Sequence, residues 1–180
     1  MNTKIINVEL STSSIENAIN TLTEIRKTIK MINDDFIYES LEFIMDRAKK
    51  YHNARTYNFE NTANINNDWH IKRVLNRKNE IGYELRNDND LVAYVEFGTG
   101  IVGEIDPHKV ADKVNYEYDM NNHQLNGWTF TNKEFNLHFI DFIGYEGQSF
   151  LYDAFWDYFY KDEWKRIYQK NYDKYMKYIK

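Results

Sequence analysis

Two stripes of apolar residues dominate the first third of the chain, and both have the period of one helix face. The frame shifts at Asn33-Asp34-Asp35, and an unbroken helix over residues 14–51 would be about 55 Å long. We therefore predict two helices with a bend at Asn33, the first capped by Ser13 or Ser14 and the second by Asp34 or Asp35. The first stripe is Ile15, Ala18, Leu22, Ile25, Ile29 and Ile32, and the second is Ile37, Leu41, Ile44, Ala48 and Tyr51.

Residues 52–68 are polar and rich in asparagine, which favours a long loop. The pattern then changes to a period of two, with Trp69, Ile71, Arg73 and Leu75 in the first run and Ile81, Tyr83 and Leu85 in the second. This alternation predicts a β-hairpin that turns at residues 77–79. A shorter strand is predicted near the start of the chain, over residues 4–8.

An apolar segment then ends abruptly in glycine, in the sequence Tyr94-Val95-Glu96-Phe97-Gly98-Thr99-Gly100. We predict a short helix that ends in a turn, because glycine reaches positive φ angles without steric cost. Glu96 lies within the apolar run, so its carboxylate must find hydrogen-bond donors if it is buried. We expect Glu96 to be at least half buried and to accept hydrogen bonds from the Gly98–Gly100 turn.

Residues 99–127 form a second long loop without clear periodicity, although 109–114 fit one or two helical turns. Residues 128–130 and 137–143 read as two paired strands. The last helix is predicted to begin near Ser149, and its first part carries aromatic residues on every side. A helix that is apolar all round must be covered all round.

One domain of this size covers only one face of such a helix, so a second subunit is the expected cover for the rest. Tyr152, Trp156 and Tyr160 share one face at spacings of four, and we predict that they form the main subunit interface. Beyond Asp162 the stripe narrows to Trp164, Tyr168, Tyr172, Tyr175 and Ile179. Residues 165–180 are therefore either a packed helix or a solvated helical tail.

The patterns above predict an α+β fold with two N-terminal helices, an antiparallel meander and an aromatic C-terminal helix. The bulk properties fit a single domain over residues 1–180. The chain has 180 residues, 15 tyrosines and no cysteine, and its net charge is −5. The missing cysteines exclude disulfides and cysteine-based metal sites. The negative charge argues against a general nucleic-acid binder, which would have a basic patch. No apolar run is long enough to span a membrane.

The sequence offers little catalytic chemistry. No two of the five histidines have the spacing of a zinc site on a helix, and no phosphate-binding loop or serine elbow is present. Glu104, Asp106 and His108 form the best metal-like cluster, but without a second histidine. We therefore expect no enzyme activity, no cofactor and no bound metal. Lys72, Arg73, Arg77 and Lys78 are the only local basic cluster, read as a solvated strand face, with nucleic-acid contact as the weaker alternative.

The segment from Tyr94 to Gly100, followed by Ile101-Val102-Gly103, resembles the signature of a family of long-tailed bacteriophage proteins. These are the tail-completion or neck proteins typified by gene product ten of phage HK-ninety-seven. Gly127-Trp128 and the helix opening at 147–154 are similar to the family's later motifs. The chain departs from the pattern at Arg55-Thr56-Tyr57, where the family has a glycine in place of Tyr57, and at Ser149, where proline is common.

The resemblance implies a structural virion protein that joins head to tail through a homo-oligomeric ring with six-fold symmetry. The implied partners are a head-closure connector and a tail terminator, with genome DNA passing through the lumen without specific binding and no membrane contact. Assembly would take place in the bacterial cytoplasm. The alternative is a binding module for glycans or nucleic acid that uses the aromatic region 99–130, where Tyr116, Tyr118 and Trp128 offer stacking surfaces.

Overall fold

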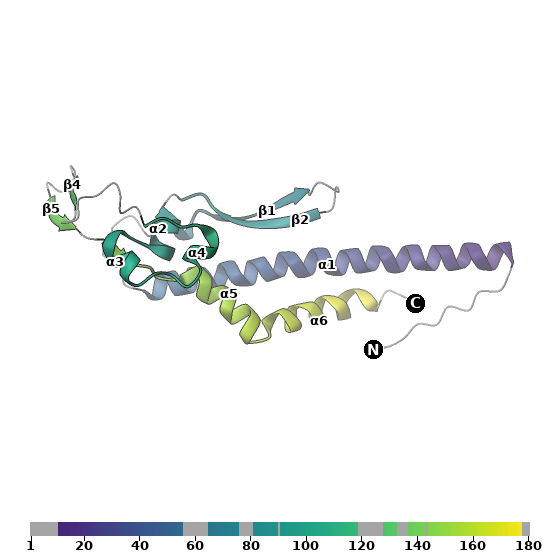
Figure 1. The fold of residues 1–180 in the computed structure, drawn as a ribbon. Helices are drawn as coiled ribbons and strands as arrows, with labels where there is room; N and C mark the ends of the chain where they lie inside the picture. Colours follow the sequence, from purple (N-terminus) through teal and green to yellow (C-terminus); the bar gives the residue numbers. More distant parts are fainter. Residues whose placement is uncertain are drawn as a thin grey trace.

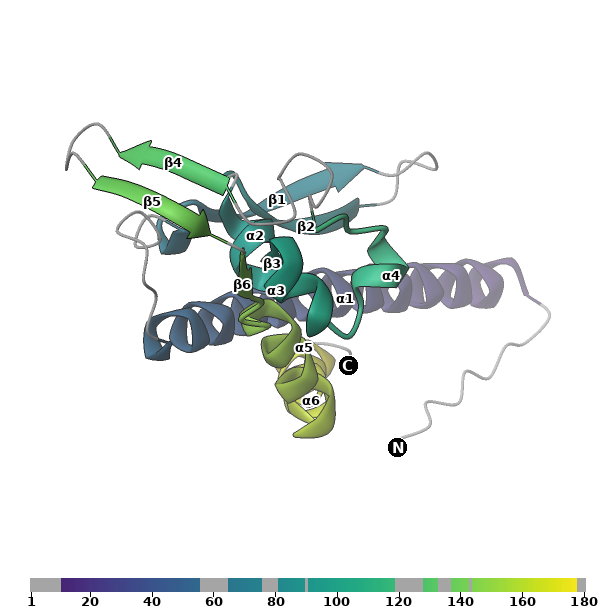
Figure 2. The same cartoon turned by 60° about the vertical axis from the view of Figure 1, so that its left-hand side comes forward.

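The computed structural model describes residues 11–55, 65–75, 81–89, 91–118, 128–132, 137–142 and 144–177. These residues form a mixed α and β fold organised along one long helix, α1, as Figure 1 shows. A β-hairpin lies along one side of α1, and the C-terminal helices pack against the other side (Figure 2). The predicted strand over residues 4–8 lies outside the described residues.

The N-terminal helix is continuous from Thr12 to Ala54, so the predicted pair of helices with a bend at Asn33 is wrong. The segment contains neither proline nor glycine, and its Asn and Asp residues lower helix propensity only weakly. The helix is about 65 Å long. This length does not conflict with a compact body because the N-terminal part of α1 projects beyond it (Figure 1).

The start of α1 also differs from the prediction. Ser11 is the N-cap, and its hydroxyl accepts the backbone N–H of Ser14 at 3.3 Å. Serine is among the best capping residues because its oxygen satisfies a backbone donor that the first turn leaves unpaired. The predicted cap was therefore two or three residues too late, and the helix does not restart at Asp34 or Asp35.

The predicted hairpin is confirmed. Strand β1 (Trp69–Leu75) pairs antiparallel with β2 (Ile81–Asn87), and Arg73 lies opposite Tyr83 in the register. Residues 52–54 of the predicted loop 52–68 belong instead to α1, and Ile65 within it is fully buried; residues 56–64 lie outside the described residues. The turn at 77–79 lies outside the described residues.

The described strands do not form the predicted meander. Three separate two-stranded antiparallel sheets are present in the described ranges. Besides β1–β2, these are β3 (Gly98–Thr99) with β6 (Gly144–Glu146), and β4 (Trp128–Asn132) with β5 (Leu137–Phe142). The pairing of β4 with β5 agrees with the predicted pair of strands.

The last predicted helix is divided in two. Helix α5 (Phe150–Tyr160) begins near Ser149 as predicted, and α6 (Glu163–Met176) follows a break at Asp162, whose φ of 55° is left-handed. The break folds α6 back along α1. Residues 178–180 lie outside the described residues.

Helix α6 packs on α1 and is not a solvated tail. Its buried residues are Ile167 and Asn171, not Trp164 and Tyr168 of the predicted stripe, which are exposed. The Asn171 amide donates to the Glu39 carboxylate at 3.0 Å. Burial of a polar residue is tolerated here because the amide has this acceptor.

A second polar contact joins α6 to α1 nearer the N-terminus. The Asp35 carboxylate accepts the Tyr175 hydroxyl and the Lys174 ammonium, both at 2.6 Å. Burial opposes ionisation of Asp35, but these donors and the lysine charge hold its pKa below the usual range. Asp35 therefore lies in the middle of α1 and binds two residues of α6.

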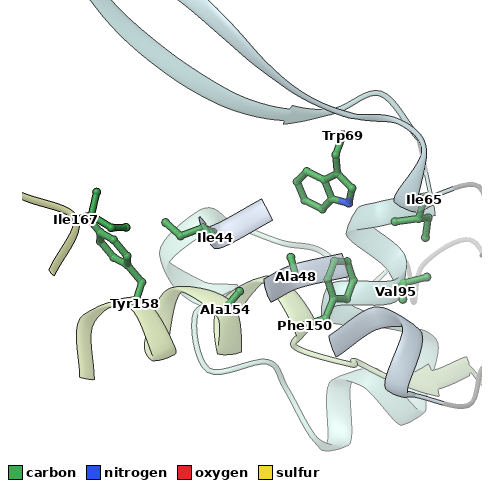
Figure 3. Close-up of a cluster of buried hydrophobic side chains, with 9 residues drawn as sticks. All are labelled: Ile44, Ala48, Ile65, Trp69, Val95, Phe150, Ala154, Tyr158 and Ile167. Carbon is green, nitrogen blue, oxygen red and sulfur yellow. The ribbon is translucent and has the colours of Figure 1, made fainter. Parts of the chain in front are cut away.

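The core lies where α1, α5 and the start of the hairpin meet (Figure 3). Trp69 points from β1 towards the Phe150 ring, which α5 contributes, and the two rings meet edge to face with centroids 6.4 Å apart. Polar contacts complete the α1–α5 contact, since the Tyr158 hydroxyl donates to Ser40 and the Tyr51 hydroxyl to Asp157. The buried cluster comprises Ile44, Ala48, Ile65, Trp69, Val95, Phe150, Ala154, Tyr158 and Ile167.

His52 makes the stability of this core depend on pH. Its side chain is buried at the C-terminal end of α1 against the Phe150 ring. Burial, with a smaller effect of the Arg55 charge, lowers the pKa of His52 from its ordinary value of 6.5. The unfolded chain therefore binds a proton near pH 6.5 that the folded protein binds only at lower pH.

We expect the contribution of His52 to stability to be complete above pH 6.5 and to be lost as the pH falls below it. The maximum slope from one such group is about 1.4 kcal/mol per pH unit. The check is urea denaturation of the wild type and a His52→Leu variant between pH 5 and pH 8. The variant should have the flatter profile, and parallel profiles would show that His52 does not titrate in this way.

Candidate functional site

The segment from Tyr94 to Gly100 forms a short helix and a turn, as predicted. Helix α2 (Leu91–Phe97) begins after Asn89, whose side-chain oxygen accepts the Leu91 N–H at 2.9 Å. Gly98 and Gly100 have φ angles of 87° and 62°, which explains why glycine occupies both positions. The turn leads into helix α3 (Gly100–Ile105).

Glu96 is the centre of this region. It is only 4% exposed, which confirms the predicted burial. Its two carboxylate oxygens accept the backbone N–H groups of Leu151 at 2.8 Å and Tyr152 at 2.9 Å. Those groups belong to the first turn of α5, where unpaired donors and the positive end of the helix dipole favour an anion. Glu96 therefore caps α5 from a distant part of the chain.

The prediction that the N–H groups of the Gly98–Gly100 turn donate to the Glu96 carboxylate is wrong. Gly98 and Thr99 pair with β6 instead, and the Gly100 N–H donates to the Tyr118 carbonyl at 2.8 Å. The N-cap of α5, Ser149, is left-handed at φ 51° and makes no side-chain capping bond. The carboxylate of Glu96 fills that role, because α5 has no capping side chain of its own at this position.

The backbone after β6 fastens the start of α5 to the end of α2. The N–H groups of Gln148 and Ser149 donate to the carbonyls of Val95 and Glu96 at 2.8 and 3.1 Å. A Cβ atom on Gly147 would lie 2.5 Å from the Phe97 carbonyl carbon, so only glycine fits here. The segment Tyr94–Gly100 therefore provides part of the surface on which the start of α5 packs.

His108 lies beside Glu96 and not in a metal cluster. Its Nε2 is 3.3 Å from a Glu96 oxygen, and both side chains are buried. The Nδ1 atom accepts the Val110 N–H at 3.3 Å, so the neutral ring carries its proton on Nε2, facing Glu96. Glu104 and Asp106, the other members of the predicted cluster, are exposed. No group of three potential metal ligands occurs among the described residues.

The predicted loop 99–127 is partly helical and covers this site. Helix α4 (Ala111–Val114) falls within the segment for which one or two turns were predicted. Tyr116 stacks on Phe97 with ring centroids 4.6 Å apart, and its hydroxyl donates to the Gly98 carbonyl at 2.7 Å. The Tyr118 hydroxyl accepts the backbone N–H of His108 at 2.8 Å. Both tyrosines therefore stabilise the turn, and residues 119–127 lie outside the described residues.

A ladder of stacked rings runs along the outer face of α5. The Trp156 ring lies 6.0 Å from Tyr152 and 3.9 Å from Tyr160 between centroids, and both pairs are close to parallel. The Lys109 ammonium lies over the Tyr152 ring at 5.6 Å. Trp156 is 47% exposed and Tyr160 is 68% exposed. We call Tyr152, Trp156 and Tyr160 the aromatic ladder, and its residues share one face as the sequence predicts.

Further exposed rings flank the ladder. Phe155 and Phe159 are 40% and 58% exposed. An aromatic side chain buries about 150–250 Å², so Phe155, Phe159 and the two exposed rings of the ladder, all about half exposed, present roughly 300–500 Å² of apolar surface. Such a patch is as large as the largest usually found on a soluble monomer, and patches of this size are typical of interaction sites.

Comparison with known proteins returned no match, since no protein-family model, curated protein or solved structure is significantly similar to the chain. No helix in the described part of the chain has the length and apolarity needed to cross a lipid bilayer.

Sequence reasoning found the ladder and the burial of Glu96 but missed two features. It did not pair His108 with Glu96, and it did not assign the start of α5 as the ligand of the Glu96 carboxylate. The sequence carried no signal for the second feature, because Ser149 stands directly before the helix and serine is a favoured capping residue. Only the structure shows that Ser149 makes no capping bond and that the Glu96 carboxylate takes its place.

Proposed function

We propose that the protein is a structural subunit of the neck of a tailed bacteriophage, a tail-completion component that joins the head connector to the tail. In this proposal, copies of the chain associate into a ring, six-fold in symmetry, through which genome DNA passes without specific binding. The ring contacts a head-closure protein on one side and a tail terminator on the other. It is assembled in the bacterial cytoplasm and acts in the virion.

The aromatic ladder carries this proposal. Two of the three stacked rings, Trp156 and Tyr160, and two flanking phenylalanines are exposed within one helix of eleven residues. Aromatic residues are enriched in the buried centres of protein interfaces, where they account for much of the binding energy. An assembly subunit needs such a surface.

The resemblance of residues 94–100 to the neck-protein signature gives the proposal its biological setting. In this chain the segment positions α5 through Glu96. A signature whose role is to orient the interface helix is consistent with a protein whose function is assembly. The buried Glu96–His108 pair contacts the start of α5 and the Tyr152 ring, which is consistent with the structural role that we propose.

The direct test combines mass measurement in solution with electron microscopy of the phage particle. The purified protein, or its complex with the connector, should have a mass close to six subunits and appear as rings with an open lumen. Antibody labelling of intact particles should place it between head and tail. A strictly monomeric protein that is missing from purified virions would rule the proposal out.

The alternative, a glycan or nucleic-acid module at residues 99–130, has no particular observation in its favour. The Tyr116 and Tyr118 rings are half-buried, and their hydroxyls are already bonded to the Gly98 carbonyl and the His108 backbone N–H. The basic hairpin residues Lys72 and Arg73 are exposed on β1, as expected of a solvated strand face. Arg77, Lys78 and the side chain of Trp128 lie outside what the structure describes.

A further inference from the structure

The N-terminal part of α1 carries an apolar face that no other described residue covers. Ile32 is the first buried residue of the helix, so the segment Thr12–Met31 precedes the core contact. This segment is roughly 30 Å long, and Figure 1 shows it projecting beyond the β1–β2 hairpin and α6. Its exposed apolar residues are Ile15, Ile19, Leu22, Ile29 and Met31.

The apolar residues of this segment recur with the period of a coiled coil. Along the stripe from Ile15 to Ile32 the spacings alternate strictly between three and four, which averages 3.5 residues and not the 3.6 of a straight helix. Ile19 and Met31 do not belong to this stripe. Ile15, Leu22 and Ile29 then occupy a positions, and Ala18, Ile25 and Ile32 occupy d positions. A strict 3.5 repeat keeps one seam facing a second helix along its whole length.

We infer that the segment Thr12–Met31 is a self-association surface, on which α1 of a second copy of this chain packs in a parallel coiled coil. This inference does not depend on the proposed function or on the aromatic ladder. It accounts for a face that the subunit's own described core leaves exposed.

The charges on α1 are compatible with a second copy. The a and d positions carry no charge over three heptads. Arg26 occupies an e position, and in a parallel pair it faces Thr21, a g position, of the second copy, so no like charges meet. The Thr21 hydroxyl donates to the Asn17 carbonyl at 2.9 Å and therefore needs no water when covered. The Glu24–Lys27 ion pair at 2.8 Å lies on the opposite, solvated face.

The burial of Ile32 favours a parallel pair over an antiparallel pair in full register. An antiparallel pair in full register places a positions opposite d positions, so Ile15 of one helix would meet Ile32 of the other. Ile32 is only 3% exposed because its own subunit covers it. In a parallel pair each Leu22 meets its own equivalent, and the exposed layers at Ile15, Leu22 and Ile29 all contribute.

Sedimentation velocity across micromolar to submillimolar concentrations gives the first test. We expect a concentration-dependent mass that Leu22→Asp reduces, with association weakened about 30-fold or more. The matched control is Asn20→Asp, which adds the same charge at an f position on the solvated face. A wild type that is monomeric at every concentration would overturn the inference, as would unchanged association of Leu22→Asp.

Cross-linking provides a second test, because the chain has no cysteine. A disulfide requires Cα atoms within about 7 Å. Leu22→Cys should therefore form a covalent dimer on mild oxidation, whereas Asn20→Cys should not. The Leu22→Cys dimer should also form in a Trp156→Asp background. Equal cross-linking at both positions, or its loss in the Trp156→Asp background, would show that α1 does not pair as described. Circular dichroism of each variant confirms that the subunit remains folded.

Discussion

Replacing Glu96 with alanine is expected to lower the free energy of unfolding by about 3–5 kcal/mol. The carboxylate accepts two backbone N–H groups of α5 at 2.8 and 2.9 Å and is almost fully buried. Alanine would leave both donors without an acceptor in a region closed to water. Each unsatisfied buried donor costs about 1–3 kcal/mol, and the loss of the negative charge at the helix N-terminus adds to this.

Two further variants separate the contributions to this effect. Glu96→Gln keeps the shape and one acceptor but turns an NH2 group towards one N–H, so its loss should be about half as large. Glu104→Ala removes an exposed carboxylate from the neighbouring helix α3 and should change stability by less than about 0.5 kcal/mol. Urea denaturation gives all three values. A Glu96→Ala variant within 1 kcal/mol of the wild type would mean that the carboxylate does not cap α5.

The consequences of this capping reach the proposed interface. Tyr152 donates its N–H to Glu96 and is also the first ring of the aromatic ladder. His108 contacts both Glu96 and the Tyr152 ring, whose centroid lies 5.4 Å from that of the imidazole. The Tyr94–Gly100 segment therefore sets the position from which the ladder begins, although Trp156 and Tyr160 lie beyond its reach.

Elements with a strong local pattern were predictable from the sequence. The β1–β2 hairpin follows from two runs with a period of two, and the short helix α2 follows from an apolar run between Asn89 and Gly98. The shared face of Tyr152, Trp156 and Tyr160 needs only helical spacing. In each case the deciding information lies within a few residues of the element.

The single helix α1 was not predictable in the same way. The shift of frame at Asn33 suggested a bend, and the expected length argued against a continuous helix. The helix is continuous because nothing in it breaks the backbone, and α6 returns to bind Asp35 at the supposed bend. This contact joins residues that lie 140 positions apart, so no local window contains it.

The ligand of Glu96 was also beyond local reasoning. The prediction chose the nearest free N–H groups along the chain, those of the glycine turn. In the structure those groups pair with β6 and the Tyr118 carbonyl. The carboxylate instead meets a helix end 55 residues away. Burial of a charge predicts that donors exist, but only the tertiary fold identifies them.

Replacing Trp156 with aspartate is expected to leave the subunit folded and to prevent its assembly. The side chain is half-exposed and lies on the outer face of α5, away from the core cluster around Phe150. The subunit loses only the stacking of Trp156 on its two neighbours, worth about 0.5–1.5 kcal/mol for each pair. The cost of placing an uncompensated charge in a desolvated contact is several kcal/mol, so association should weaken by two orders of magnitude or more.

The matched control is Trp164→Asp, the same substitution at a residue of α6 that is 37% exposed and lies outside the ladder. Trp156→Phe keeps an aromatic ring and should retain most of the association. Thermal unfolding establishes that each subunit is folded, mass measurement gives its oligomeric state, and complementation of a phage lacking the protein gives the yield of intact particles.

If Trp156→Asp assembled at the normal yield, or if Trp164→Asp blocked assembly equally, the ladder would not be the interface. A Trp156→Asp variant that failed to fold would place the indole in the core of the subunit instead. Selective loss of assembly with a folded subunit is the outcome that a desolvated contact at the centre of the ladder requires.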